Sequence, residues 1–342
     1  MQLTDLAFPA SWLKQAAPLV QALLANDNYL ICAHARLDGD ALSSMAAMGH
    51  FLAQHGKKFQ IYTPCGVPDD FAFFRLPAPA YCSLKALPSK PDVVLALDCG
   101  NPDRLGDELA AKMDRLACIN IDHHVGPGMG TIASLVIPEA ASTTQVLASV
   151  FRQAGCELAG DLAEALALGL VTDTGGFRHA NATPAVFALA AYLEQQGVSV
   201  HSLREKLEKN WTLARMRLWG RLADRIQLLE ENRLAFCAMP IEVLAECGAG
   251  DRDIEGFVEH MRDLRKVQAS CFVREQTTSV CKFSLRSAGG VDVRRAAAAL
   301  GGGGHTNAAG GVIRKPLAEA CKDLQNVLAD ILADASADEE RA

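Results

Sequence analysis

The sequence of 342 residues lacks the features that mark several classes of protein. It has no apolar run near the roughly 18 residues that a membrane-spanning helix needs. The first basic residue is Lys14, and no apolar signal core follows it, so we expect no secretory signal. The net charge of −7 is the opposite of the positive excess with which proteins coat long nucleic acids. Half of the residues are hydrophobic and 21% are charged, which excludes extensive disorder.

The eleven cysteines also lack the pattern of a disulfide framework or a structural zinc site. Their number is odd, they are scattered, and no two of them form a CxxC pair. In a chain long enough for about two domains, they indicate reduced, mostly buried thiols of a cytoplasmic protein.

Charge is distributed unevenly along the chain. Residues 1–190 carry 12 basic and 18 acidic side chains, whereas residues 211–316 carry 16 basic and 12 acidic ones. This asymmetry favours a metal-rich face in the first part and an anion-binding face in the second, although ordinary scatter of surface charge explains the same balance.

Short apolar segments alternate with helical patterns in the first half. Strands are expected at 28–33, 59–63, 93–98, 118–122 and 134–137, and helices at 41–55, 142–154, 161–171 and 184–197. Because strands separated by helices form right-handed βαβ units, we expect an α/β fold with a mostly parallel sheet and helices on both faces. Ligands of such sheets bind beyond the carboxyl ends of the strands.

The second half has a different pattern. Apolar residues recur every three or four positions between 203 and 226, which predicts an amphipathic connector helix. Strand-like segments follow at 233–239, 269–274 and 280–285, with a glycine-rich loop near 301. We therefore expect four parts: a parallel-sheet domain, a helical connector, a smaller mixed-sheet α/β domain and a frayed polar tail, at 1–190, 191–228, 229–333 and 334–342.

Acidic and histidine side chains follow the predicted strands or end a helix in four segments. These are AHARLDGDALSS (33–44), LALDCG (95–100), NIDHHVGPG (120–128) and LVTDTGGFRH (170–179). One such acid is typical of a helix cap or a turn, but four segments at one edge of a sheet indicate a cluster. Converging carboxylates repel one another unless cations neutralise them, and this set matches two divalent ions.

The composition of the cluster indicates the metal and the reaction. Imidazole and carboxylate ligands without a thiolate suit Mn²⁺ better than structural Zn²⁺, and we expect the nearby Cys32 and Cys99 to point into the core. Two divalent ions about 4 Å apart polarise a phosphoryl group and lower the pKa of a bound water. The expected reaction class is the hydrolysis of a phosphoester or phosphoanhydride.

Four successive glycines, Gly301–Gly304, form either a flexible loop or an anion-binding nest. They lack the Lys-Ser/Thr of a P-loop, but glycines let backbone N–H groups approach a phosphate closely. His305 and the nearby Arg286 would supply charged donors to it. Arg178 and His179 are weaker candidates for the same pocket, with a solvated loop as the alternative.

The order HxxxDxD, a strand-terminal Asp, DHH and TDTGGF resembles the DHH phosphoesterase superfamily. FSLRS (283–287) and LGGGGHTNAAGG (300–311) resemble the DHH-associated substrate domain of RecJ-like and oligoribonuclease members. The motifs frame residues 34–311. The compact chain resembles the stand-alone oligoribonucleases that degrade nanoRNA and also act as 3′-phosphoadenosine 5′-phosphate phosphatases.

The resemblance implies a role for each motif residue. Six side chains would hold the two metal ions: His34 and Asp38 the first, Asp40, His123 and Asp173 the second, with Asp98 bridging both. Asp122 would orient the site and His124 would face the scissile phosphate, which makes these two and Asp98 the catalytic set. The substrate would be gripped, as two domains close around it, by Arg286, Gly302, Gly303, Gly304 and His305, with Arg178 beside them. Leu37 stands where many relatives have proline, which changes no ligand.

The function implied is hydrolysis of short oligoribonucleotides to 5′-mononucleotides and of 3′-phosphoadenosine 5′-phosphate. A phosphodiesterase for cyclic or linear dinucleotides is the alternative, because both substrates present the same bond. A pyrophosphatase and a non-catalytic nucleotide sensor fit the motifs less well. The partners expected are short RNA or small nucleotides, without membrane or long DNA, and a homodimer is left open.

Overall fold

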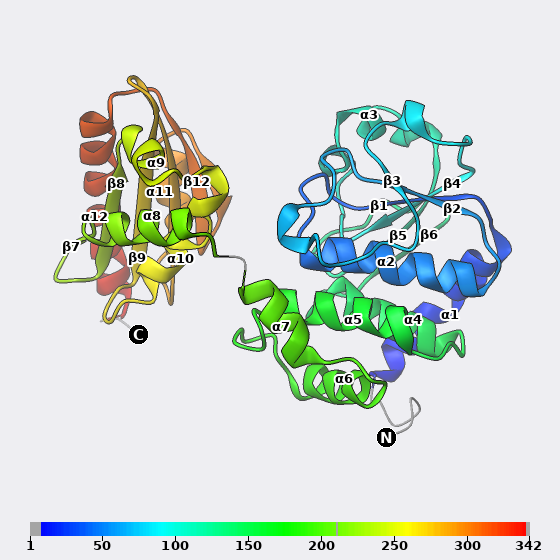
Figure 1. The fold of residues 1–342 in the computed structure, drawn as a ribbon. Helices are drawn as coiled ribbons and strands as arrows, with labels where there is room; N and C mark the ends of the chain where they lie inside the picture. The colour runs from blue at the N-terminus through cyan, green and yellow to red at the C-terminus, as the bar shows by residue number, and fades with distance from the viewer. Residues whose placement is uncertain (1–7, 210, 340–342) are drawn as a thin grey trace. The chain divides into compact units, whose positions relative to one another are not determined.

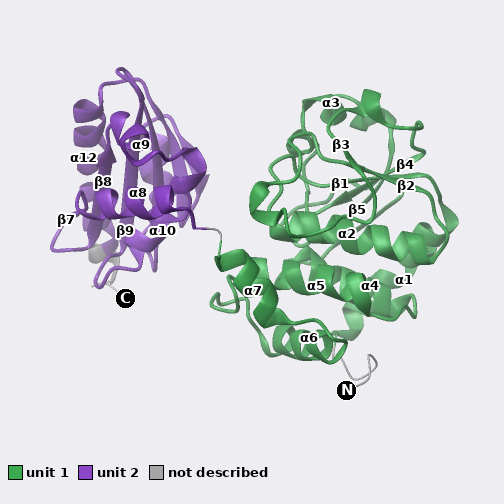
Figure 2. Cartoon of the chain, in the orientation of Figure 1, with its two compact units in different colours: residues 1–210 green, residues 211–342 purple. Residues whose placement is uncertain are grey.

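The computed structural model describes residues 8–209 and 211–339. It divides the chain into two compact units, residues 1–210 and 211–342, which are coloured separately in Figure 2. Each unit contains one six-stranded sheet and its own helices. The expected α/β fold, with a parallel sheet followed by a smaller mixed sheet, is confirmed.

The sheet of the first unit is entirely parallel, in the order β3-β2-β1-β4-β5-β6. Its strands are β1 Tyr29–Cys32, β2 Phe59–Tyr62, β3 Ala80–Tyr81, β4 Val93–Leu97, β5 Ala117–Asp122 and β6 Ala133–Val136. The chain builds outward in one direction from β1 and in the other from β4, so the strand order reverses between these two neighbours. A crevice opens beyond the carboxyl ends of the strands at such a point, and three of the four acidic segments begin there.

The strands of the first sheet alternate between two cores. Tyr29 and Ile31 of β1 contact a helical layer that contains α1 Ala10–Ala25, α2 Gly39–Gln54, α4 Thr143–Gln153 and α5 Gly160–Asp173. Leu30 and Cys32 face the opposite core, which short 3₁₀ turns and α3 Asp107–Ala110 complete, on the other side of the sheet in Figure 1. Cys32 and Cys99 are both buried in this second core, as expected. Helices α6 Pro184–Gln195 and α7 Val200–Glu208 complete the unit.

The sheet of the second unit is mixed, in the order β11-β12-β10-β9-β8-β7. Its strands are β7 Gln227–Leu229, β8 Leu234–Met239, β9 Ala269–Thr277, β10 Val280–Ser287, β11 Gly303–His305 and β12 Ala308–Ile313. Only the β8–β9 pair is parallel among the described strands of this sheet. Three helices, α8 Leu213–Ala223, α9 Glu242–Cys247 and α10 Phe257–Arg262, pack on one face, and α11 Val293–Ala299 with α12 Leu317–Glu339 packs on the other.

Three of the predicted segments differ in the structure, and helix α1 and strand β3 were not predicted. The expected connector at 191–228 is divided between the units, because Thr212 accepts a hydrogen bond from the Arg215 amide and begins α8 as a new helix. Helix α12 continues through the expected tail as far as Glu339, since that segment is rich in the strong helix former alanine, and residues 340–342 lie outside the described range. Gly303–His305 forms the edge strand β11 in place of a loop.

Two properties of the described chain bear on its surroundings. All eleven cysteines are free thiols, and most of them are buried. None of the helices within residues 8–209 and 211–339 has both the length and the apolarity needed to cross a bilayer.

Candidate metal centre and open face of the second sheet

The loop that follows β1 supplies the first group of site residues. His34 comes two residues after the strand and is 5% exposed, while Asp38 caps the N-terminus of α2 by accepting a hydrogen bond from the Ala41 amide at 3.0 Å. Their four-residue spacing brings His34 Nε2 to 3.3 Å from Asp38 Oδ2. Asp40 lies in the first turn of α2 and is fully buried.

Asp98 follows β4 directly and faces both groups of histidines. Its backbone has a φ of 52°, an uncommon value for a non-glycine residue, and its amide donates to the Ile121 carbonyl at 3.0 Å. Its Oδ2 lies 3.5 Å from His34 Nε2, and its Oδ1 lies 3.6 Å from His123 Nε2. The carboxylate therefore presents a different oxygen to each side, which is the placement required of a bridging ligand.

The DHH triplet begins with the last residue of β5. Asp122 Oδ1 accepts hydrogen bonds from the amides of His123 and His124, at 2.7 and 3.0 Å, and from His124 Nδ1 at 2.8 Å. Burial raises the pKa of Asp122, but these donors outweigh it and hold the pKa below its usual value. The same hydrogen bond raises the pKa of His124. Asp122 thus fixes the orientation of the His124 ring.

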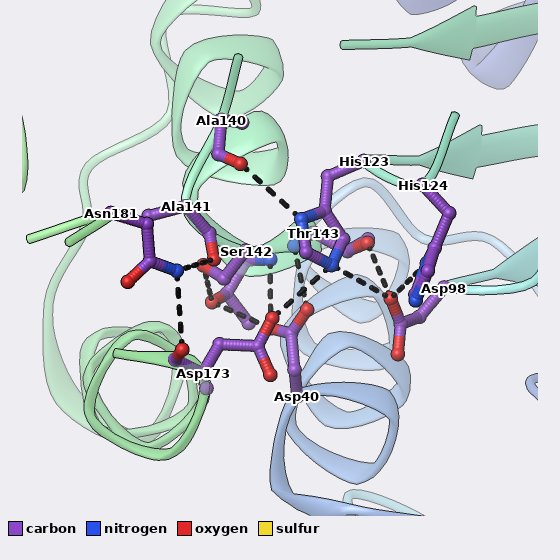
Figure 3. A network of polar contacts seen from close by, with 12 residues as sticks. Asp40, Asp98, His123, His124, Ala140, Ala141, Ser142, Thr143, Asp173 and Asn181 are labelled. Atoms are coloured by element: carbon purple, nitrogen blue, oxygen red, sulfur yellow. Dashed lines mark hydrogen bonds and ion pairs between the residues drawn. The ribbon is translucent and has the colours of Figure 1, made fainter. Parts of the chain in front are cut away.

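Asp173 ends helix α5 and completes the second group. Its Oδ2 lies 3.1 Å from His123 Nε2, and Figure 3 shows Asp40, Asp98 and His123 converging on the same space. Helix α5 approaches this space closely, because a Cβ at Gly169 would lie 2.5 Å from Asp40 Oδ1. Glycine at this position leaves room for the buried carboxylate.

The donor set fits divalent cations. Three groups have ligand atoms within 4.8 Å of one another: His34, Asp38 and Asp98; Asp40, His123 and Asp173; and Asp98, His123 and His124. His34 Nε2 is buried without a hydrogen-bond partner, although it faces two carboxylates, as expected of an atom that shares a metal ion with them. Burial and the nearby aspartates raise the pKa of Asp40 well above its usual value, which reflects negative charge that a cation would neutralise.

Protons occupy this site when metal does not. Burial lowers the pKa of His34 and His123, but the neighbouring carboxylates more than reverse this and raise both values to about 9. Both imidazoles therefore carry a second proton at neutral pH in the metal-free protein.

The second unit holds the other candidate residues on one face of its sheet. Arg286 of β10 pairs in register with Ala308 of β12, which pairs in turn with His305 of β11. Side chains of directly opposed residues leave a sheet on the same side, so Arg286 and His305 share a face. The alternate residues Phe283 and Leu285 point the other way, into the core beneath α11 and α12. Helices α8, α9 and α10 pack on the same side of the sheet as Arg286 and His305, but mainly over β8 and β9. We call the rest of this side, which carries Arg286 and His305, the open face.

The open face is polar and includes a hollow of about 360 Å³ beside α10. Arg286 Nε donates to Glu259 Oε1 at 2.8 Å in this hollow, which Lys282 and Ser284 also line. The glycines at its edge are required by close packing: a Cβ at Gly304, whose φ is 142°, would lie 2.5 Å from the Ala308 carbonyl oxygen. Gly302 approaches the β12 backbone in the same way, whereas Gly303 has open space on its side-chain side.

The loop after Asp173 places its two candidates differently. Arg178 is exposed, and its Nε donates to the Gly175 carbonyl at 2.8 Å, so it does not reach a metal-ligand side chain through any hydrogen bond of the described residues. His179 Nδ1 lies 3.3 Å from the Asp173 carbonyl and supports the backbone of that ligand.

The sequence prediction did not single out Thr143, Thr144 or Asn181, which contact the metal-ligand residues. A polar residue at the start of a helix or in a loop is typical of ordinary capping. Only the tertiary contacts distinguish these three residues from caps.

Metal binding to this site is expected to release protons. Because His34 and His123 have pKa values of about 9, protons compete with metal below that pH, and the apparent metal affinity should rise as the pH increases from 7 to 9. Calorimetric titration of the metal-free protein with Mn²⁺, in buffers of different ionisation enthalpy, measures the protons released. His34→Asn should lower that number, and an affinity independent of pH would contradict the assignment of these ligands.

Comparison with known proteins covers both units. Residues 28–170 match the DHH family, N-terminal domain, and residues 239–334 match the DHHA1 domain. The chain is 31% identical over 285 residues to the bifunctional oligoribonuclease and PAP phosphatase NrnA of Thermus thermophilus, covering 83% of each chain. It is 24% identical over 301 residues to the protein of the same name from Bacillus subtilis, covering 86% of this chain and 92% of that one.

A crystal structure of an exopolyphosphatase-related protein from Bacteroides fragilis has the same fold. Its TM-score to this chain is 0.85 at 26% identity, and the match covers 94% of this chain and 98% of that one. The match to the DHH family, residues 28–170, includes every motif of the predicted centre up to the DHH triplet. Asp173 lies three residues beyond the end of that match. The chain belongs to the DHH family of phosphoesterases, which are divalent-metal-dependent hydrolases of phosphoester bonds, and it carries a DHHA1 domain in its second half.

Proposed function

We propose that this phosphoesterase hydrolyses short oligoribonucleotides to 5′-mononucleotides, and also 3′-phosphoadenosine 5′-phosphate, with two Mn²⁺ ions. The observation that carries the proposal is the convergence of histidines and aspartates at one sheet edge, with Asp98 directed to both groups. The NrnA relatives support the substrate class, because their names state both activities and the similarity spans more than four-fifths of each chain.

Each group of ligands has a role in the proposed reaction. His34 and Asp38 would hold one ion, and Asp40, His123 and Asp173 the other, with Asp98 shared. Two divalent ions at these positions would polarise a phosphoryl oxygen and lower the pKa of a water nucleophile. The mixture of imidazole and carboxylate without thiolate favours Mn²⁺.

His124 is the proposed contact to the scissile phosphate. Its side chain is 44% exposed, and its Nδ1 is bound by Asp122, which leaves Nε2 for a ligand. Because Asp122 raises the pKa of His124, the protonated ring is favoured, and an imidazolium is a charge-assisted donor to a phosphate oxygen.

The open face of the second sheet is the proposed binding surface for the rest of the substrate. Arg286 and His305 lie in one row across three strands, and Gly303 leaves the backbone of the edge strand β11 accessible beside His305. A row of this size suits a few nucleotides. Arg178 is the weaker candidate, because its guanidinium is bound to a loop carbonyl.

The thiols support a reducing compartment. All eleven cysteines are free, including several deep in both units, where burial raises the pKa of thiols such as Cys118 and Cys237 to about 12 and keeps them unreactive. We therefore place the enzyme in the cytoplasm.

Chelation is expected to abolish hydrolysis, and Mn²⁺ to restore it better than Zn²⁺ or Ca²⁺. Asp98→Ala should cost more activity than any other single ligand change, because its two oxygens face both groups of ligands. Rates after chelation and addition of each metal, for the wild type and the six ligand variants, measure this. Full activity in excess chelator would reject the two-metal assignment.

Substrate length is the main test of the proposed function. We expect faster turnover of di- to pentanucleotides than of 20-mers, with 5′-mononucleotides released one at a time. A parallel assay of short RNA, 3′-phosphoadenosine 5′-phosphate, cyclic di-AMP and pyrophosphate compares the proposal with its alternatives, and Asp98→Ala controls for contaminating nucleases. Preference for long RNA, for the cyclic dinucleotide or for pyrophosphate would overturn the proposal.

Changes on the open face should impair substrate use while the metals stay bound. A charge-assisted contact is worth about 1.5–3 kcal/mol, so Arg286→Ala and His305→Ala should each lower kcat/KM on oligonucleotides at least tenfold. Metal content and melting temperature should match the wild type. Arg294→Ala is the matched control: it removes an exposed arginine whose one ion pair among the described residues is with Asp292, at the start of the same helix. Unchanged kinetics or lost metal would show that this face does not bind the substrate.

A further inference from the structure

The turn that precedes α4 contacts Asp40, Asp98 and His123 directly and is connected to Asp173 through Asn181. Ser142, Thr143 and Thr144 are fully buried there, and Ser142 Oγ caps the helix by accepting the Gln145 amide at 3.0 Å. Because Thr143 and Thr144 are the first two residues of α4, their amides have no partner within the helix and point beyond its N-terminus.

Both amides are directed at Asp40. The Thr143 amide donates to Asp40 Oδ2 at 2.6 Å, and the Thr144 amide and hydroxyl donate to Asp40 Oδ1 at 3.1 and 2.9 Å. A carboxylate has about four acceptor positions, so these three donors fix both oxygens and leave room for one further ligand contact. The positive end of the α4 dipole favours the charged form of Asp40.

The Thr143 hydroxyl is directed at a different carboxylate. It donates to Asp98 Oδ1 at 2.9 Å, the oxygen that faces His123, while Asp98 Oδ2 faces His34. Thr143 therefore holds Asp40 through its backbone and Asp98 through its side chain, as Figure 3 shows.

The carbonyl groups of the same turn hold the other two ligands. His123 Nδ1 lies 3.3 Å from the Ala140 carbonyl oxygen, which leaves Nε2 as the ligand atom. Asn181 Nδ2 donates to the Ala141 and Asp173 carbonyls, both at 3.2 Å, and so connects the turn to the end of α5.

We propose that Thr143 is a positioning residue of the metal centre: its hydroxyl sets which Asp98 oxygen faces the second metal group, and the turn around it arranges Asp40, His123 and Asp173. The proposal rests on the divalent-metal dependence of the family and not on the identity of the substrate. Residues that orient metal ligands in this way change metal affinity by roughly 10–100-fold when they are removed.

The test is calorimetric titration of the full, metal-free chain with Mn²⁺, beside melting curves of the same samples. We call binding at the first metal group the first event and binding at the second metal group the second event. Thr143→Val keeps the size of the side chain and removes the hydroxyl, and it should weaken the second event at least tenfold. The first event should change less than threefold, because Thr143 contacts Asp98 through Oδ1, whereas the oxygen that faces His34 is Oδ2. Thr143→Ser retains the hydroxyl and should bind both ions as the wild type does.

Two matched variants separate positioning from a general effect on the helix. Thr144→Val removes a hydroxyl from Asp40, which keeps two amide donors, so it should weaken the second event less than Thr143→Val. Ser149→Ala removes a buried hydroxyl of α4 whose one hydrogen bond within the described part of the chain is to the Val146 carbonyl. It should leave both affinities unchanged even if the protein melts at a lower temperature.

Asn181→Ala tests the same turn from a half-buried position, where loss of folding is not expected, and should weaken the second event at least fivefold. The proposal is overturned if Thr143→Val binds two ions with wild-type affinity, whatever Asn181→Ala does. It is equally overturned if Thr143→Ser is as weak as Thr143→Val, because the volume of the side chain would then matter and not its hydroxyl. If the substrate proves to be a different one but the variants change the metal affinities as predicted, this proposal stands while the proposed function fails.

Discussion

The repulsion among three carboxylates at one sheet edge is the constraint around which the first unit is arranged. Asp40 and Asp98 are almost completely buried, and Asp173 is partly buried beside them. Burial is the main cause that raises the pKa of Asp40 and of Asp173; neighbouring aspartates add to it, and for Asp173 it outweighs the opposing effect of His123. An uncompensated buried charge is strongly destabilising, so the fold must supply donors and the site must take up cations or protons.

The fold brings these charges together through its strand order. The strand order reverses between the neighbouring strands β1 and β4. The loop after β1, the residue after β4 and the end of β5 therefore meet at one edge of the sheet. The helical layer then adds its own groups from behind: α4 directs two amides at Asp40, and α5 approaches closely enough at Gly169 to bring Asp173 to His123. The same residues that satisfy the carboxylates therefore also fix the packing of α2, α4 and α5.

The sequence was sufficient for the parts that depend on local pattern. Five strands of the first sheet, all but the two-residue β3, were predicted from short apolar runs, and their limits in the structure differ by a residue or so from those expected. Two of these runs, at β4 and β5, lead into an aspartate. The roles given to His34 or Asp98 came from the resemblance to a family, whereas their proximity follows from a parallel sheet. The carboxyl ends of parallel strands share one edge of the sheet, so the acidic and histidine residues that follow the strands could be expected to form one cluster. The charge of that cluster and the types of metal ligand in it then follow from the sequence.

The parts that the sequence did not predict depend on long-range contacts. Strands β11 and β12 are rich in glycine and alanine, which have low strand propensity, and they form because β12 pairs with β10. The spacing of apolar residues that predicted one connector helix continues across two helices. That spacing gives no sign of the capping residue Thr212, at which the second helix begins. Thr143 and Asn181 resemble ordinary cap and loop residues, and their partners lie 45 and 40 residues away along the chain.

On the open face of the second unit, as at the metal centre, a partly buried charge has a partner of opposite charge. Arg286 is paired with Glu259 at 2.8 Å, and the second oxygen of Glu259 is buried without a hydrogen-bond partner. A phosphate bound at Arg286 would exchange one charge-assisted contact for another, so its affinity would be set by the difference between the two contacts and not by the strength of either one. Such an exchange keeps the guanidinium ordered before substrate arrives, which lowers the entropy cost of binding.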